Sequence, residues 1–237
     1  MNLDQLVREY APILHFHPDE GDFCCFPSDA ENIYEEFHRD WTKFKEDRSP
    51  NTLIYSTPCY YETWTDDEMT QIRYWFWYNY NDFPKAPFGL GKHIGDWEHV
   101  EVRIYEENSL DDTIWLLSNH LEAAIASFDI TLKNIHPERP KLDKSHIHAW
   151  VALGSHANYP LPTSKTRSYG RVLRDRIRDE GDIWHTEHGL KPILETNFRD
   201  FKGRWGDEKS PRSPLSEYNN RWRNFPNIEP DFYSANS

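Results

Sequence analysis

Apolar and charged side chains alternate most clearly where Val100, Val102 and Ile104 are separated by charged residues. This two-residue period predicts a β-strand with one apolar face. Continued towards the N-terminus, the same period places Asp96 and Glu98 on that face. Two carboxylates at the end of a core-facing row are costly to bury unless a cation or hydrogen-bond donors neutralise them. This stretch is therefore the first candidate for a functional centre.

Other segments carry the periodicities of helices and strands. The run from Ile72 to Tyr80 is aromatic on both faces, which is typical of a central strand covered on both sides. The spacing of Leu110, Ile114, Leu117, Leu121, Ile125 and Phe128, after a capping-box pattern at Ser109, predicts a helix. In all, we expect helices at 3–10, 28–41 and 110–128, and strands at 13–20 (ending in a polar turn), 52–63, 70–80, 100–105, 146–153, 181–185 and 192–195.

These elements indicate a mainly β protein, a single-domain β-sandwich with peripheral helices over residues 1–208. Residues 161–180 are polar and basic, as expected of a surface excursion. An irregular tail follows at 209–237, where four prolines interrupt any regular pattern. A chain of 237 residues is long enough for one sizeable core.

Composition narrows the function. Aromatic residues make up 15% of the chain, which suits a globular β-rich protein and argues against disorder. A formal net charge of −13 disfavours nucleic acid and anionic membrane surfaces as partners. It is compatible with binding cations, sugars or neutral small molecules.

The cysteines and the N-terminus predict a cytoplasmic location. Three cysteines, two of them the neighbours Cys24 and Cys25, make a poor disulfide framework and a weak metal motif, so buried thiols are expected. The first residues show no signal-peptide pattern. No apolar run approaches the roughly 20 residues that a membrane-spanning helix needs.

Several segments follow one another in a recognisable order, namely Leu6 to Pro27, WFWYNYND, HIGDWEHVEVRI, ALGSHANYP and Gly203 to Gly206. In this order the chain resembles the vacuolar protein sorting-associated protein 62 family over most of its length.

A more distant resemblance connects the first candidate stretch with the necrosis- and ethylene-inducing-like toxins, whose hallmark is a GHRHDWE heptapeptide. The pattern His-x-x-Asp-Trp-Glu occurs here from His93 to Glu98, with Gly95 in place of the second histidine. The resemblance implies a β-sandwich in which His93, Asp96 and Glu98 bind a divalent cation. It also implies a fourth ligand, Asp82, because the run from Trp77 to Asp82 matches the preceding strand of those toxins.

Three carboxylates and one imidazole suit hard cations, with Mg²⁺ or Ca²⁺ favoured and Mn²⁺ a further candidate, better than Zn²⁺. An alternative interpretation is a structural set of buried carboxylates, satisfied by arginine, lysine and backbone donors.

Two histidines are candidate proton-transfer groups. His156 follows a strand in a turn of small residues, where a side chain is exposed at the rim of a sheet. His99 lies in the first candidate stretch, but on the face opposite the carboxylates. Hydrogen bonding to a neighbouring carbonyl, without catalysis, is the alternative for both.

A ligand cleft has further candidates. Trp97, Tyr159, Trp184 and His185 could line it, with core packing as the alternative for each aromatic residue. Arg204 is a candidate ion-pair partner for a carboxylate of the metal cup. Glu20 is a candidate acid that supports a metal ligand from behind.

Two functions from different classes follow. The first is a metal-containing, lectin-like binding protein whose metal cup recognises a small polar or glycan-like ligand. The second is a metal-dependent hydrolase or lyase, with the cation as Lewis acid and His156 as general base. A position of His156 close to the cup would favour the enzyme. A trafficking role would follow from the first family resemblance alone.

Overall fold

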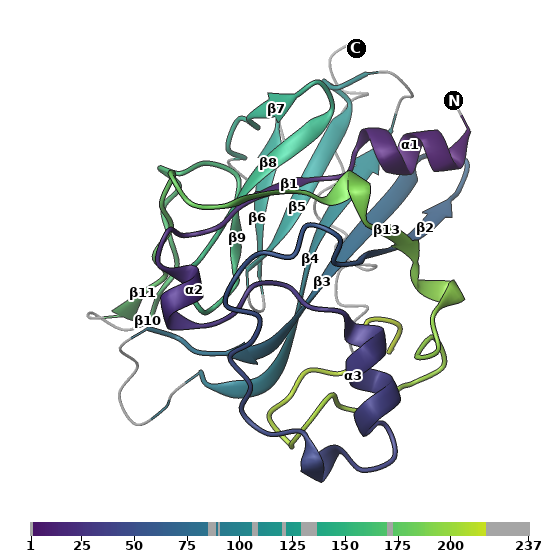
Figure 1. The fold of residues 1–237 in the computed structure, drawn as a ribbon. Helices are drawn as coiled ribbons and strands as arrows, with labels where there is room; N and C mark the ends of the chain where they lie inside the picture. Colours follow the sequence, from purple (N-terminus) through teal and green to yellow (C-terminus); the bar gives the residue numbers. More distant parts are fainter. Residues whose placement is uncertain are drawn as a thin grey trace.

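Two β-sheets face each other across an apolar core (Figure 1). The computed structural model describes residues 2–84, 89, 91–105, 109–119, 122–128, 137–169 and 173–216. The larger sheet has the order β13-β2-β3-β4-β5-β6. Its strands are β13 (Leu190–Pro192), β2 (Cys59–Thr65), β3 (Thr70–Asn81), β4 (His93–Ile104), β5 (Thr113–Asn119) and β6 (Glu122–Ser127).

The smaller sheet has the order β12-β1-β8-β7, and β9 also pairs with β8. Its strands are β12 (Ile183–His185), β1 (Ile13–His15), β8 (His146–Val151), β7 (Leu142–Asp143) and β9 (Asn158–Tyr159). A separate pair joins β10 (Ser168–Tyr169) to β11 (Leu173–Arg174). The helices are α1 (Leu3–Glu9), α2 (Glu20–Phe23) and α3 (Ala30–Phe37), with short 3-10 helices at Trp41–Lys43, Thr186–His188 and Ile193–Glu195. The expected single-domain, mainly β fold is confirmed.

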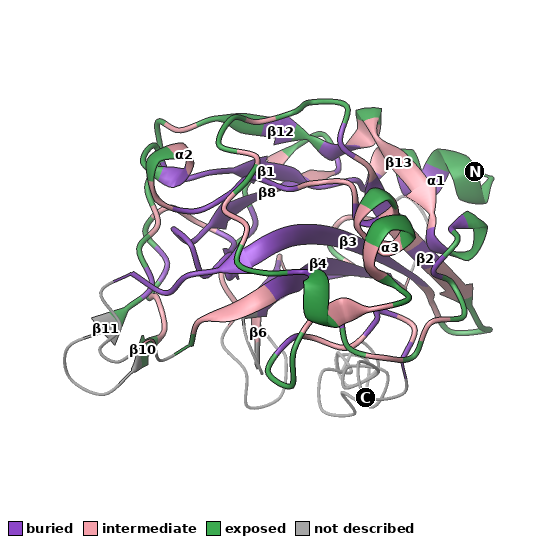
Figure 2. Ribbon diagram, turned by 60° about the horizontal axis from the view of Figure 1, so that its bottom comes forward, coloured by how far each residue is buried: buried purple, intermediate pink, exposed green. Residues whose placement is uncertain are grey.

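The main core lies between the two sheets, whose buried strands form separate layers in Figure 2. Alternate residues of β3, among them Phe76 and Tyr78, point into it together with Val100 and Val102 of β4. β3 is a central strand, paired on its two edges with β2 and β4. Apolar clusters cover both faces of its aromatic run, as the sequence predicts.

A second cluster covers the outer face of the larger sheet and makes a third layer. Trp75 and Trp77 of β3 and Trp97 of β4 pack there against α3 and the segment that contains Phe198 and Trp205. The cluster holds large aromatic side chains at edge-on and tilted angles, the geometry that aromatic rings prefer. The aromatic richness of the chain is therefore largely a packing feature.

The helix expected at 110–128 is wrong, because the structure has a β-hairpin of β5 and β6 there. Leu117 and Ala126 face the main core, whereas Ile114, Leu116 and Ile125 pack on the other face. A strand that is apolar on both faces has no two-residue alternation, so its spacing can imitate a helix. Residues 120 and 121 lie outside the described residues.

Several boundaries also differ from expectation. The strand expected at 52–63 begins only at residue 59, and the one expected at 192–195 lies at 190–192, followed by a 3-10 helix. The strand expected at 100–105 begins earlier, at residue 93. Of the expected tail, residues 209–216 are described and bury Ser210, Ser213 and Ser216, whereas 217–237 lie outside the described residues.

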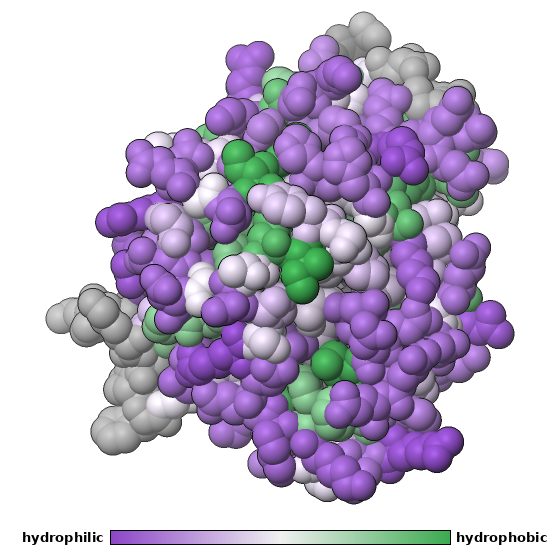
Figure 3. All heavy atoms as spheres, viewed as in Figure 1, coloured by the Kyte–Doolittle hydropathy of each residue, from purple (hydrophilic) through white to green (hydrophobic). Residues whose placement is uncertain are grey.

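In the described part of the chain, no helix is long and apolar enough to cross a membrane. The face drawn in Figure 3 is mainly hydrophilic, and its apolar side chains form small separate groups. Scattered groups of this kind are usual on protein surfaces.

Candidate metal centre

Asp96 and Glu98 point into the space between the sheets, as the period of β4 predicts. Their strand partners on β3 are Tyr78 and Phe76, which belong to the main core. Each carboxylate residue is only 6% exposed. Trp97, between them, packs in the outer aromatic cluster. The inward and outward division of this motif is therefore confirmed.

His156 joins Asp96 from the turn after β8. Its Nδ1 lies 3.1 Å from Asp96 Oδ2, and its ring stacks on Tyr78 with 3.7 Å between ring centroids. The backbone of His156 has a φ of 54°, a conformation that is uncommon outside glycine. The expected rim position is not found, because His156 is fully buried.

Glu20 of α2 completes the surroundings of His156. Its Oε1 lies 3.8 Å from His156 Nε2, and its carboxylate accepts hydrogen bonds from Gly154 N. Gly154 has a φ of +64°, and a Cβ there would lie 2.3 Å from Asp82 O, so glycine is required at this turn. The turn thus brings the α2 carboxylate and the end of β3 next to the imidazole.

Glu98 belongs to a hydrogen-bond chain on the other side of Asp96. Its carboxylate accepts a very short hydrogen bond from the hydroxyl of Ser118, on β5. The amide of Asn158, on β9, donates to the same hydroxyl oxygen at 3.2 Å. Neither residue is a candidate from the sequence, because the segment of Ser118 has helical spacing and no local pattern distinguishes Asn158.

The raised pKa values of Glu98 and Glu20 show that these buried carboxyl groups are costly to ionise. Burial and the neighbouring Asp96 raise the pKa of Glu98 well above its usual range. Burial also raises the pKa of Glu20 to about 7, although His156 and Gly154 N–H oppose the shift. Burial is the largest effect on His156 and would lower its pKa, but the contacts with Asp96, Cys24 and Glu20 together outweigh it, and the pKa rises to about 10. The site therefore favours a positive charge, whether it comes from a bound proton or from a cation.

Asp82 and His93 are engaged outside this cluster. Arg48 Nη2 lies 2.5 Å from one Asp82 carboxylate oxygen, and Lys92 Nζ lies 2.8 Å from the other. His93 Nδ1 donates to Gly95 O at 2.7 Å, and its Nε2 accepts from the side-chain amide of Asn81 at 2.8 Å. The arrangement of Asp82 is the one that the alternative, structural interpretation predicts.

The four expected ligands are therefore not gathered around one point. Among the described residues, Cys24, Cys25 and His156 form a group whose ligand atoms lie within 4.8 Å of one another. All three cysteines are free and buried, as expected. The proximity of the two thiols to His156 has no signal in the sequence, because it depends on how the two sheets meet.

The other predicted site residues are dispersed. Trp184 is fully buried in the main core and packs edge-on against Phe76. Tyr159 is buried, and its hydroxyl donates to Asp175 Oδ2 at 2.6 Å. His185 is exposed on β12, at the edge of the smaller sheet.

The remaining two also lie away from the inward-facing acids. His99 packs beside Trp75 on the outer face, with 4.3 Å between ring centroids. Arg204 is exposed, and its Nη1 donates to the carbonyl oxygen of Ser210 at 2.7 Å.

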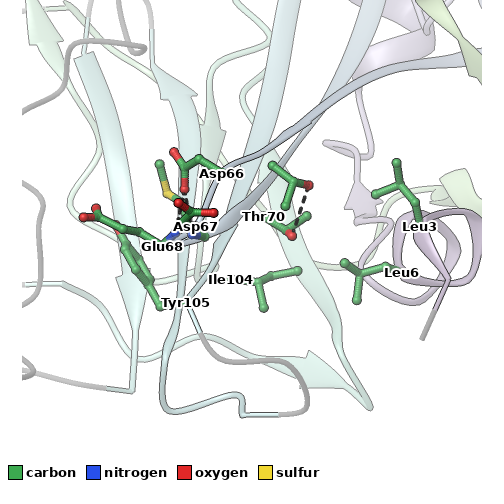
Figure 4. Close-up of a pocket in the computed structure, with 10 residues that line it drawn as sticks. Leu3, Leu6, Asp66, Asp67, Glu68, Thr70, Ile104 and Tyr105 are labelled. Atoms are coloured by element: carbon green, nitrogen blue, oxygen red, sulfur yellow. Dashed lines mark hydrogen bonds between the residues drawn. The ribbon is translucent and has the colours of Figure 1, made fainter.

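A surface pocket of about 370 Å³ lies at the opposite end of β3 and β4, next to α1 (Figure 4). Its lining includes the acidic turn of Asp66, Asp67 and Glu68. Asp66 Oδ1 accepts hydrogen bonds from the backbone N–H groups of Glu68 and Met69, so this carboxylate serves the turn. The pocket contains none of the predicted site residues.

Glu20, Asp96, Glu98 and His156 form a buried cluster, called the acid cup below. Three buried polar atoms in or beside it have no hydrogen-bond partner, namely Tyr78 Oη, Asn158 Oδ1 and His156 Nε2. The side-chain oxygen of Asn158 and the carboxylates are hard donors that fit a hard cation, whereas the imidazole nitrogen also fits softer metals. The residues present therefore fit a bound cation.

Comparison with known proteins supports the fold. No family profile and no curated protein matches the sequence. The non-toxic HaNLP3 protein matches with a TM-score of 0.56 and 14% identity, over 97% of this chain and 93% of its own. A structure described as a toxin fold for microbial attack and plant defense matches with a TM-score of 0.54 and 14% identity, over 95% and 89%. NLPPya in complex with mannosamine matches with a TM-score of 0.53, 14% identity and the same coverage.

The expected β-sandwich of the necrosis- and ethylene-inducing proteins is therefore confirmed at the level of fold. At 14% identity the likeness shows nothing about ligands or activity. None of these comparisons bears on the vacuolar protein sorting-associated protein 62 family, and that resemblance stays a prediction.

Proposed function

We propose that this chain is a divalent-metal-binding protein whose metal cup recognises a small polar or glycan-like ligand. The observation that supports the proposal is the pair of buried carboxylates on β4. Asp96 and Glu98 share the inward face of one strand, and the neighbouring Asp96 raises the cost of ionising Glu98. A cation of the Mg²⁺, Ca²⁺ or Mn²⁺ class would neutralise both.

By resemblance to the toxins, His93 and Asp82 are the other two ligands in this proposal, and both would have to leave their present partners to share a cation with Asp96 and Glu98. Both lie at the same end of β3 and β4 as Asp96, since Asn81 pairs with His93. Lys92 and Arg48 neutralise Asp82 in the structure, so a cation bound there would compete with them. The supporting role of Glu20 is to hold His156 from the side opposite Asp96.

The ligand class is supported by the fold alone. NLPPya, a protein of the same fold, was solved in complex with mannosamine and with glucosamine. Amino sugars are therefore the first ligands to test on this chain. The hydroxyl groups of a sugar can complete the coordination shell of a hard cation, because such ions take six or more oxygen ligands.

The test is calorimetric titration of the purified protein with Mg²⁺, Ca²⁺ and Mn²⁺, and then with glucosamine and mannosamine in the presence of the cation that binds. We expect Asp96→Asn to abolish cation binding. Asp67→Asn, a matched change of an exposed carboxylate in the β2–β3 turn, should leave it unchanged. The proposal is wrong if none of the three cations binds, or if Asp96→Asn binds as tightly as the unaltered protein.

A metal-dependent enzyme is the second candidate, and one observation favours it. Asp96 holds His156 through Nδ1 and leaves Nε2 without a hydrogen-bond partner, as an oriented general base requires. Two features of His156 count against this role: its pKa of about 10 keeps the imidazole protonated at neutral pH, and its full burial keeps substrate from the nitrogen. Cation-dependent cleavage of chromogenic glycosides that disappears in His156→Gln would favour the enzyme.

A further inference from the structure

Two adjacent thiols lie close to the imidazole of the acid cup. Cys24 and Cys25 follow α2, and their sulfur atoms lie 3.1 Å apart. Both sulfur atoms lie 3.3 Å from the carbonyl oxygen of Tyr80, on β3. With one nitrogen of His156, the ligand atoms all lie within 4.8 Å of one another. Two separate parts of the chain thus deliver three metal-binding groups to one point.

One nitrogen of the buried imidazole lies among these ligand atoms. His156 is fully buried, and its Nε2 has no hydrogen-bond partner. Its other nitrogen, Nδ1, lies 3.1 Å from Asp96 Oδ2. This arrangement is the one found behind many metal-binding histidines, where a carboxylate fixes the ring and its tautomer while the opposite nitrogen binds the metal. A buried nitrogen without a partner otherwise costs stability.

We propose that Cys24, Cys25 and His156 bind one thiophilic metal ion, Zn²⁺ or Cu⁺. Thiolates are ligands of this class and are poor ligands for Mg²⁺ or Ca²⁺, and imidazole commonly accompanies them at Zn²⁺ and copper sites. Zn–S bonds of about 2.3 Å at a tetrahedral centre place two sulfur atoms about 3.8 Å apart. The two thiols therefore separate by about 0.7 Å when the ion binds, and the two thiols and the protonated imidazole each release one proton to solvent.

This site is chemically separate from the proposed hard-cation cup. Asp96 and Glu98 supply carboxylate oxygens on one side of the imidazole, and the thiols supply sulfur on the other. The assignment also gives His156 a ligand role in place of a general-base role. The two sites share Asp96, which contacts His156, but only the second needs the thiols, so the cysteine variants and the sulfur signals test it separately from the proposed function.

The test begins with the unaltered protein, purified without chelators under reducing conditions. Titration with Zn²⁺, and with Cu⁺ in competition with a chromophoric Cu⁺ chelator, should show one ion bound per chain. X-ray absorption spectroscopy of the loaded protein should show two sulfur neighbours. Co²⁺ loading should produce thiolate-to-cobalt charge-transfer absorption. These readouts need no variant, so they do not depend on how well a variant folds.

Variants then assign the ligands. We expect Cys24→Ser and Cys25→Ser each to weaken binding of the ion by at least about 100-fold and to remove the charge-transfer band. Cys59→Ser is the matched control, because Cys59 is also a free buried thiol but lies on β2, outside the group. It should bind within about twofold of the unaltered protein. Asp96→Asn should weaken binding by about 10- to 100-fold, because it removes only the support of the imidazole.

Two outcomes would overturn the inference. One is a loaded protein whose metal has only oxygen and nitrogen neighbours. The other is binding that is unchanged in both Cys24→Ser and Cys25→Ser. If the unaltered protein binds none of Mg²⁺, Ca²⁺ and Mn²⁺ but still shows the thiolate-to-cobalt charge-transfer absorption, the result counts against the proposed function alone.

Discussion

Two buried glutamates on β4 provide a direct test of whether the acid cup is built for a cation. Glu101 is fully buried and held by arginines, with Arg73 Nη2 at 2.6 Å and Arg103 Nε at 2.8 Å. Glu98 is almost as buried, but it accepts its hydrogen bond from the neutral hydroxyl of Ser118. Replacing each glutamate by glutamine keeps the shape and removes the negative charge. The two changes should have very different effects.

For Glu101→Gln, the guanidinium of Arg73 keeps its charge in a fully buried position and loses its closest counter-ion. Breaking a buried ion pair on one side costs about 3–5 kcal/mol. For a protein of this size, a loss of about 3 kcal/mol corresponds to a fall in melting temperature of about 6–12 °C.

For Glu98→Gln, a repulsion disappears. Residues two apart on a strand lie about 7 Å from each other. Two negative charges at that distance would repel by about 2.4 kcal/mol at an effective dielectric constant of 20, and this is an upper limit because the raised pKa of Glu98 lowers the charge on its carboxyl group. Because glutamine still accepts the hydrogen bond of Ser118, we expect Glu98→Gln to lose less than about 1 kcal/mol, or to gain stability.

The assay is urea denaturation at pH 7 in the presence of a chelator, with both variants and the unaltered protein measured together. A loss for Glu98→Gln as large as that for Glu101→Gln would refute the reasoning. It would mean that protein donors already satisfy the Glu98 charge, as the structural interpretation of the carboxylates requires.

Two further changes test the surroundings of the site. Gly95→Ala should lower stability by about 2 kcal/mol or more in thermal denaturation, because φ is +65° and a Cβ would lie 2.2 Å from Trp77 Cη2. Gly89→Ala shares the positive φ but meets no atom closer than 3.7 Å, so it should cost about 1 kcal/mol, and equal losses would exclude the clash as the cause. Burial lowers the pKa of His15 to about 4, so protons bind the unfolded chain preferentially and stability should fall as pH drops from 6.5 towards 4. His15→Phe should flatten this part of the pH–stability curve while His188→Phe, a change of an exposed side chain, should not; a curve left unaltered by His15→Phe would contradict the assignment.

The pattern of the sequence predicts the central part of the fold well. The alternation around Val100 correctly separates Asp96 and Glu98 from Trp97, because β4 keeps one period along its length. The doubly apolar run of β3 correctly indicates a central strand. The same double coverage misled the assignment of β5 and β6, where apolar residues on both faces imitate helical spacing.

The candidate site is less accessible to sequence reasoning, because its partners come from distant segments. The sequence singles out His156 and Glu20, but only the fold shows that the imidazole lies between Glu20 and Asp96. The contacts of Asp82 with Lys92 and Arg48 depend on loop geometry that has no periodic signal. Cys24 and Cys25 have no second cluster nearby in sequence, and only the approach of the turn after β8 supplies their imidazole neighbour.

The central claim is that the inward-facing carboxylates of β4 bind a divalent cation. Its most direct test is the melting temperature of the protein with and without Mg²⁺, Ca²⁺ or Mn²⁺ at about 100 times the dissociation constant found by calorimetry. Binding to the folded state alone would add about 2.7 kcal/mol, or roughly 5–11 °C. We expect this rise in the unaltered protein and in Asp67→Asn, and its absence in Asp96→Asn. No rise with any of the three cations, or the same rise in Asp96→Asn, would contradict the claim.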